Sequence, residues 1–378
     1  MSMKLTDTLS YKVDWLSFTK KCNIADSQIT IDEILDYLGY DKSLFKKMDN
    51  GRYFYNAGIT LGNYVNVYFN EATDTLSSKA PRSVNFQWTG VGTSDLADRL
   101  AVVYENEDRE KNWIRFFKWL YANECKPTRI DLALDDFAGE VSFDLMIKKL
   151  KAGHYRSVKK TYSINRDADQ KGKISGLSLY FGKNTKTSRG TYFARFYLKL
   201  QEFQSKGQLP PTIARKTGVW NRFEIAFSKQ KACDVIDKII QTGSFGEVYF
   251  GVLRSIVEFL NPKRGKNGKV YSNKDYWRVC PWWEKFLQHA KTVRVGSDDV
   301  RTIEFADLLR YIRVQVVPSL RLLEQLGKHT DPNFDIYHMI KMCDIGQFSK
   351  KQIRLYNNAL TMPPELIKLY LKQFIEGY

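Results

Sequence analysis

The sequence predicts an α+β fold in which a central, mostly antiparallel sheet has flanking helices and is followed by a mainly helical C-terminal part. Stretches of alternating apolar and polar residues, typical of half-buried strands, recur through the first 245 residues. Glycine-containing turns separate several of these stretches. Beyond about residue 245, most apolar residues recur at helical spacing. We therefore expect an α+β body over residues 1–245 and a helical region over residues 246–378.

The composition places the chain among ordinary globular proteins. Its 378 residues suffice for two or three domains, and 43% hydrophobic with 27% charged residues excludes a disordered chain. No apolar run approaches the roughly 20 residues that cross a bilayer, and the N-terminus lacks the apolar core of a signal peptide. Five scattered cysteines without a C-x-x-C pair indicate reduced thiols. We expect a cytoplasmic protein without membrane contact.

The charge balance indicates a polyanionic partner. Lysine and arginine total 59 against 42 acidic residues, which gives a net charge of +17. Neutralising phosphates releases counterions, so such an excess favours binding to DNA or RNA. Aromatic residues make up 14% of the chain, and some of them could stack on unpaired bases. A merely basic soluble protein remains the alternative on charge alone.

The first half of the body alternates between strand and helix patterns. Residues 11–20 form the first expected strand, and residues 32–40 form a short helix. Residues 52–71 and 83–92 are expected to form two or three strands broken by glycine turns. Over residues 94–124 the apolar residues fall on two helical stripes.

The second half of the body contributes the strands that matter most for function. The expected elements are a strand over residues 125–139, a helix over residues 142–155 with Ser142 as its N-cap, and strands over residues 176–183, 192–200 and 219–227. A basic segment, residues 182–190, joins the first two of the last three strands as a hairpin. In the C-terminal part, residues 304–327 form the longest helical pattern, which Pro318 interrupts, and residues 363–378 form the last.

Three of these strands divide their faces in the same way, with apolar residues on one side and ionic or phenolic residues on the other. Side chains alternate along a strand, so residues of equal parity share a face. If the three strands are neighbours, their polar residues form one surface. That surface would carry Arg129, Asp131 and Asp135 from the first strand, Arg195, Tyr197 and Lys199 from the second, and Arg222 and Glu224 from the third.

These residue types suit metal-assisted phosphoryl transfer. Clustered carboxylates supply the oxygen ligands that Mg²⁺ or Mn²⁺ prefers, and arginines and lysines hold phosphates. Tyr197 could attack phosphorus as a phenolate, provided that the metal and the cations lower its proton affinity. Each residue also has an ordinary explanation: Asp131 and Glu224 as members of cross-strand ion pairs, Tyr197 as a half-buried strand residue, and the cations as a solvated face.

Four motifs in a fixed order resemble the replication initiation factor family, which includes rolling-circle plasmid initiators and related relaxases of integrative conjugative elements. The motifs are RIDLALDD, YFGKNTK, RFYLKLQE and WNRFEIAF. The family pattern falls on Arg129, Asp131, Ala133 and Asp135, on Tyr180 and Gly182, on Arg195, Tyr197, Lys199 and Glu202, and on Trp220, Arg222 and Glu224. With VDWLSFT and CPWWEKFL as further landmarks, the resemblance spans roughly residues 11–325.

The resemblance implies an HUH-like nickase core and a rolling-circle replication initiator, which nicks and rejoins one DNA strand at an origin through a 5′-phosphotyrosine. The implied roles are Tyr197, Lys199 and Arg195 as catalytic residues, Asp131, Asp135 and Glu224 as ligands of Mg²⁺ or Mn²⁺, and Arg129, Arg222 and Lys183 as phosphate contacts. The four histidines include no His-x-His pair, so the carboxylates must serve in place of a two-histidine metal site.

The implied partners are origin DNA, as a single strand or an extruded hairpin, and a host helicase and polymerase. A homodimer would suit one active tyrosine per chain. Lys263, Arg264 and Lys266, in the basic segment 261–269, and the C-terminal helices are candidates for DNA contact, with a solvated loop and plain packing or oligomerisation as the alternatives. A conjugative relaxase with the same chemistry, a non-enzymatic origin-binding protein and a water-using nuclease remain as other functions.

Overall fold

The computed structural model describes residues 3–4, 8–73, 76–77, 80–168, 170, 174–182, 191–288, 291, 293, 309, 312, 316–342, 352–353, 356, 360, 364, 367–368 and 371. The chain forms two compact units, Met1–Gly296 (unit 1) and Ser297–Tyr378 (unit 2). The structure thus places the boundary near residue 296 and not at the expected residue 245. The reason is that helix α8 (Phe245–Ile256) lies in the hydrophobic core of unit 1.

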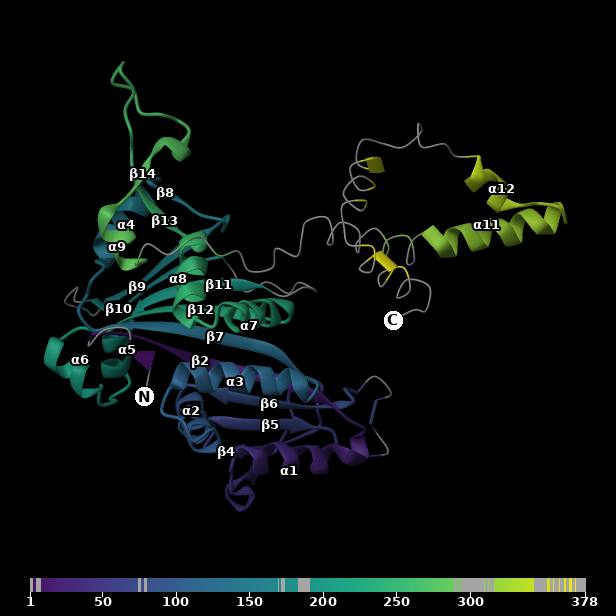
Figure 1. Ribbon diagram of the computed structural model, residues 1–378, viewed down its shortest axis with the longest axis horizontal. Coiled ribbons are helices and arrows are strands. Elements are labelled where there is room, and N and C mark those ends of the chain that lie inside the picture. Colours follow the sequence, from purple (N-terminus) through teal and green to yellow (C-terminus); the bar gives the residue numbers. More distant parts are fainter. Residues whose placement is uncertain are drawn as a thin grey trace. The chain divides into compact units, whose positions relative to one another are not determined.

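One long antiparallel sheet forms the frame of unit 1 (Figure 1). Its strands, in spatial order, are β3 (Lys46–Lys47), β4 (Ala57–Leu61), β5 (Val65–Phe69), β6 (Ser83–Thr89), β2 (Leu9–Lys21), β7 (Cys125–Asp136), β12 (Asn221–Ser228), β11 (Tyr192–Leu198), β10 (Ile174–Phe181) and β9 (Tyr162–Ala168), with β1 (Met3–Lys4) pairing beside β2. A small sheet contains β14 (Arg278–Val279), β13 (Glu258–Asn261) and β8 (Tyr155–Arg156). The predicted α+β class with an antiparallel central sheet is confirmed.

Helices flank this sheet. In chain order they are α1 (Ser27–Tyr37), α2 (Val91–Val103), α3 (Arg109–Ala122), α4 (Phe143–Lys151), α5 (Lys199–Ser205), α6 (Thr212–Thr217), α7 (Gln230–Thr242), α8 and α9 (Pro281–Phe286). The strand expected over residues 192–200 ends at Leu198, because Lys199 begins α5. Ser142 caps α4 as predicted, its hydroxyl accepting a hydrogen bond from the Leu145 amide. Among the described residues, no helix is long and apolar enough to span a membrane.

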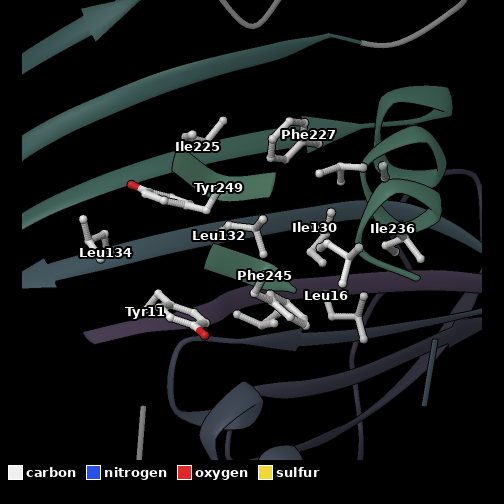
Figure 2. Close-up of a cluster of buried hydrophobic side chains, with 14 of the residues drawn as sticks. Tyr11, Leu16, Ile130, Leu132, Leu134, Ile225, Phe227, Ile236, Phe245 and Tyr249 are labelled. Carbon is white, nitrogen blue, oxygen red and sulfur yellow. The ribbon is translucent and has the colours of Figure 1, made fainter. Parts of the chain in front are cut away.

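The hydrophobic core lies on one face of the central strands. Figure 2 shows apolar side chains of β2, β7 and β12 gathered with side chains of α7 and α8. The labelled residues are Tyr11, Leu16, Ile130, Leu132, Leu134, Ile225, Phe227, Ile236, Phe245 and Tyr249. Each large apolar side chain that is fully buried contributes about 1.5–3 kcal/mol. This packing fixes which face of β7 and β12 points to the core, and therefore which face carries the polar residues.

The described residues of unit 2 are mainly helical. It contains α11 (Val317–Thr330) and α12 (Ile336–Lys341). Pro318 lies in the first turn of α11, a position that tolerates its missing N–H. Most of the helix expected over residues 363–378 lies outside the described residues. Residues 304–308, the start of the helical pattern expected over residues 304–327, also lie outside them.

Candidate active site

The strand order places the three predicted polar strands side by side, as β7, β12 and β11. In the β11–β12 pair, Arg195 lies opposite Glu224 and Tyr197 lies opposite Arg222. In the β12–β7 pair, Arg222 lies opposite Asp135. The polar residues of the three strands therefore share one face, on the side opposite the core.

Tyr197 is at the centre of this face. Its hydroxyl donates to Oε2 of Glu224 over 3.4 Å. The Arg195 guanidinium lies 3.9 Å from the centre of the phenol ring, and the Lys199 ammonium lies 5.3 Å from it, so the ring is held by cation–π contacts. The alternation pattern predicts a face that is open to solvent. In the structure this face is covered at its centre, since Tyr197 is only 3% exposed.

A small aromatic cluster lies next to Lys199, one of the cations that contact the Tyr197 ring. β11 runs directly into α5, and α5 and α6 supply apolar side chains that pack with Trp220 and Phe137. Lys199, the first residue of α5, lies 5.1 Å from the Phe203 ring centre. Its ammonium also forms an ion pair of 2.7 Å with Glu202, which keeps a cation beside the phenol.

The protein's own groups raise the pKa of Tyr197. Burial is the main cause, since it removes the hydration of the phenolate; Arg222 opposes the shift, and Glu224, Asp14 and Glu202 reinforce it. Arg222 thus lowers the pKa of Tyr197, as expected of a nearby cation, but burial outweighs this effect. The phenol needs a proton acceptor, and Glu224 is within reach.

Asp135 and Arg222 form a buried ion pair. Nε and Nη2 of Arg222 donate to the two carboxylate oxygens of Asp135 over 2.7 and 2.9 Å, and the Trp220 indole donates to Asp135 Oδ1 over 2.8 Å. The remaining nitrogen of the Arg222 guanidinium, Nη1, donates to Oδ1 of Asp14 over 2.9 Å. Both oxygens of Asp135 thus have donors already, in an arrangement that orients Arg222.

Asp131 is held by Arg129. Two guanidinium nitrogens of Arg129 donate to the two carboxylate oxygens over 3.0 and 2.6 Å, and the guanidinium stacks on Trp15 at 3.9 Å from the ring centre. Burial raises the pKa of Asp131 to about 7 against the opposing effect of Arg129, and Glu224 and Asp14 add to the rise. Burial and Asp14 likewise raise the pKa of Glu224, although nearby arginines oppose them.

Comparison with known proteins places this site in a family. Residues 125–340 match the family model of the replication initiation factor. The chain belongs to the replication initiation factor family. The matched segment contains β7, β11 and β12, and with them each of the eight polar residues predicted to share one surface.

Two relatives of this family member extend the comparison. The chain is 21% identical over 345 residues to a putative DNA relaxase NicK of Bacillus subtilis (strain 168), covering 91% of this chain and 89% of that protein. It also resembles the solved structure of a rolling-circle replication initiator protein from Geobacillus stearothermophilus, with a TM-score of 0.56 and 24% identity over 76% of this chain and 98% of that one. This second likeness supports the fold.

Sequence reasoning missed Asp14, which the structure brings into the site. In β2, Val13 pairs with Leu132 and Trp15 pairs with Asp131, so Asp14 is the extra residue of a β-bulge. Its carboxylate binds Arg222 and, over 2.8 Å, Lys12. Although burial opposes the shift, these cations hold the pKa of Asp14 well below its usual range.

The signal for this bulge is present in the sequence of β2. The buried residues Tyr11 and Val13 have odd numbers, whereas the buried residues Leu16 and Phe18 have even numbers. A strand whose core-facing residues change parity must contain an extra residue at the change. An acidic residue at that point in a polar sheet is a candidate for function.

Among the described residues, no group of three or more His, Cys, Asp or Glu side chains is arranged so that it could hold a metal ion. Mg²⁺ is usually held by one or two carboxylates, with waters and substrate phosphates completing its shell. The negative charge of Glu224 raises the pKa of Asp131, so the two carboxylates lie within electrostatic reach of each other. A cation between them would relieve that repulsion.

Four other residues were predicted to contact phosphate. Lys183 falls outside the described residues. Lys263, Arg264 and Lys266 are exposed in the connection between β13 and β14, and Figure 1 shows this connection extending away from the central strands. These three cations therefore belong to a second surface.

Proposed function

We propose that this protein is a rolling-circle replication initiator that nicks and rejoins one DNA strand at an origin through a 5′-phosphotyrosine on Tyr197. The observation that supports the proposal most strongly is the contact of the Tyr197 hydroxyl with Glu224 at 3.4 Å, among cations that suit a phosphodiester. A nucleophile, a proton acceptor and positive charge are the parts that phosphoryl transfer to a protein side chain requires.

In the proposed reaction, the phenol oxygen of Tyr197 forms a bond to phosphorus while the bond from phosphorus to the 3′ oxygen breaks. The phenol proton passes to Oε2 of Glu224, which lies 3.4 Å from the phenol oxygen. The leaving 3′ oxygen takes up a proton, for which Lys199 is the candidate donor, because burial and Arg222 lower its pKa. Rejoining is the reverse, with a 3′ hydroxyl attacking the phosphotyrosine.

Mg²⁺ or Mn²⁺ would be held by Asp131 and Glu224, with Asp14 beside them. Such an ion supplies charge neutralisation at the phosphate oxygens. Asp135 has a different part in this proposal, since its oxygens accept three hydrogen bonds from the buried side chains of Arg222 and Trp220. Among the described residues, Asp131 is held by Arg129 alone, whose side chain is 38% exposed and has room to move aside for an ion. Asp135 positions Arg222, and Arg195 and Arg129 are placed to neutralise charge on the bound phosphate.

The DNA substrate would be an origin segment presented as a single strand or an extruded hairpin. The net charge of +17 supports long-range attraction to it. Lys263, Arg264 and Lys266 would contact backbone phosphates of the flanking duplex. A host helicase and polymerase would act on the nicked product, and two copies of the chain would supply two active tyrosines.

A conjugative relaxase is the second candidate, favoured by the likeness to the putative relaxase over 91% of this chain. It uses the same nicking step, so the site supports both functions equally. A non-enzymatic origin-binding protein is less consistent with the geometry, because buried carboxylates facing DNA repel phosphate unless a cation intervenes.

The test of the common chemistry is a covalent adduct. The protein is incubated with Mn²⁺ and a single-stranded origin oligonucleotide labelled at its 3′ end, and the products are separated under denaturing conditions. We expect the label to migrate with the protein and to be lost from that position in Tyr197→Phe. Tyr192→Phe, on the same strand but on its core face, is the matched control and should retain the adduct. An adduct in Tyr197→Phe would show that another residue is the nucleophile.

A further inference from the structure

The connection between β3 and β4 presents two consecutive aromatic side chains to solvent. Phe54 is 92% exposed and Tyr53 is 58% exposed. Large aromatic residues are ordinarily buried to a great extent, since each carries a large apolar area. The residue before them is Arg52, so the tip of this connection, residues 52–54, is both aromatic and basic.

The backbone holds the tip in an uncommon conformation. Tyr53 and Phe54 have φ values of 58° and 72°, in the left-handed region that bulky residues seldom adopt. The base of the connection is firmly fixed. Position 51 has room only for glycine, because a Cβ there would lie 2.0 Å from the Tyr55 carbonyl oxygen. The Tyr55 hydroxyl forms a hydrogen bond of 2.7 Å with the Ser83 hydroxyl, which ties the connection to β6. A strained backbone on a fixed base that exposes aromatic rings suggests a binding role.

The tip lies on the same face of the sheet as the active site. The Tyr53 ring packs edge-on against Tyr68 of β5, with 5.5 Å between ring centres, and Tyr68 is buried and close to Arg52. The Tyr53 phenol is also within electrostatic range of the Arg129 guanidinium. Arg129 in turn holds Asp131 and stacks on Trp15.

We propose that Tyr53 and Phe54 form a stacking platform for unpaired bases of single-stranded DNA beside the phosphate that is cut. The proposal rests on the proposed function and adds the residues that would hold the bases. Every base offers a flat π face, so aromatic stacking binds single strands with little dependence on sequence. Arg52 and Arg129 supply positive charge for the adjoining phosphates. Tyr53 is braced by Tyr68, and Phe54 is the freer of the two rings.

The test uses the full chain carrying Tyr197→Phe, which prevents covalent capture, and oligonucleotides with 2-aminopurine at successive positions around the nick. A stacked 2-aminopurine loses fluorescence. We expect quenching at one or two positions, its loss in Phe54→Ala, and an affinity for the oligonucleotide that is roughly 5- to 150-fold weaker. Phe54→Trp should restore both, since it keeps a ring.

Two further variants separate binding from folding. Phe54→Gly accepts the left-handed backbone more readily, so it should bind as weakly as Phe54→Ala with an unfolding midpoint no lower than that of the parent. Val102→Ala removes another exposed apolar side chain, 77% exposed on α2, and should leave affinity and quenching unchanged.

Unchanged affinity and unchanged 2-aminopurine fluorescence in Phe54→Ala would overturn the platform and would point to a protein partner for the exposed rings. If the chain with Tyr197 intact forms the covalent adduct in that case, only the platform fails. If no adduct forms with any divalent metal but Phe54→Ala weakens binding, the platform stands and the nicking chemistry fails.

Discussion

Asp135→Asn tests whether Asp135 is a metal ligand or positions Arg222. The side chains of Arg222 and Asp135 are only 4% and 6% exposed, and removing one partner of such a pair leaves an uncompensated buried charge. Breaking buried pairs costs 3–5 kcal/mol, and since Asp14 still binds Arg222, we expect a loss of about 3 kcal/mol in the free energy of unfolding.

The test uses two measurements. The first is the free energy of unfolding by urea in the absence of metal. The second is the Mn²⁺ concentration that gives half-maximal covalent adduct, measured under conditions in which the protein is folded. For Asp135→Asn we expect the stability loss with no change in the Mn²⁺ requirement. Asp131→Asn should show the opposite result, with little change in the free energy of unfolding and a Mn²⁺ requirement raised by about tenfold or more. Removing or disturbing groups of a metal site costs roughly 10–100-fold in metal affinity.

The reasoning about Asp135 would be refuted by the reverse outcome. If Asp135→Asn unfolds at the same urea concentration as the parent and needs tenfold more Mn²⁺, its carboxylate binds the ion. The paired hydrogen bonds from Arg222 would then be rearranged when the metal binds.

Two other predictions concern pH and the core. Asp131, with its pKa raised to about 7, must lose its proton to hold a cation, so the Mn²⁺ requirement of adduct formation should rise as the pH falls below about 7; a requirement that is flat between pH 6 and 8 would contradict this. Tyr249→Phe removes a buried hydrogen bond of 2.6 Å to the Phe223 carbonyl and should lower the free energy of unfolding by about 1–2 kcal/mol while leaving adduct formation intact; loss of the adduct would mean that the core and the site are coupled.

The central strands were predictable because periodicity alone assigns their faces. Ile130, Leu132 and Leu134 alternate with the polar residues of β7, and burial of one face requires the other to be polar. Which strands would be neighbours was a supposition, and the register of β11, β12 and β7 bears it out. The family resemblance supplied the order of motifs and is confirmed by the match over residues 125–340.

Other features depended on long-range packing that local patterns do not contain. The ion pair between Arg222 and Asp14 joins residues 208 positions apart, and only the finished sheet brings them together. The turn from β11 into α5 is another such feature, since strand alternation predicts that the strand continues at Lys199, whereas Lys199 begins α5. The extension of unit 1 past residue 245 follows from α8, whose apolar residues needed the sheet as a partner.

The charges of the site link the metal to the DNA. Asp131 and Glu224 are already partly compensated by Arg129 and Arg195, so a divalent ion alone would leave the cluster with excess positive charge. A phosphodiester brings the negative charge that balances it. Each should therefore increase the affinity for the other by the same factor, since coupling between two ligands is reciprocal. Oligonucleotide binding to the Tyr197→Phe protein should tighten with Mn²⁺, and the oligonucleotide should lower the Mn²⁺ dissociation constant equally. Independent binding of the two would mean that the carboxylates serve only as partners of the arginines.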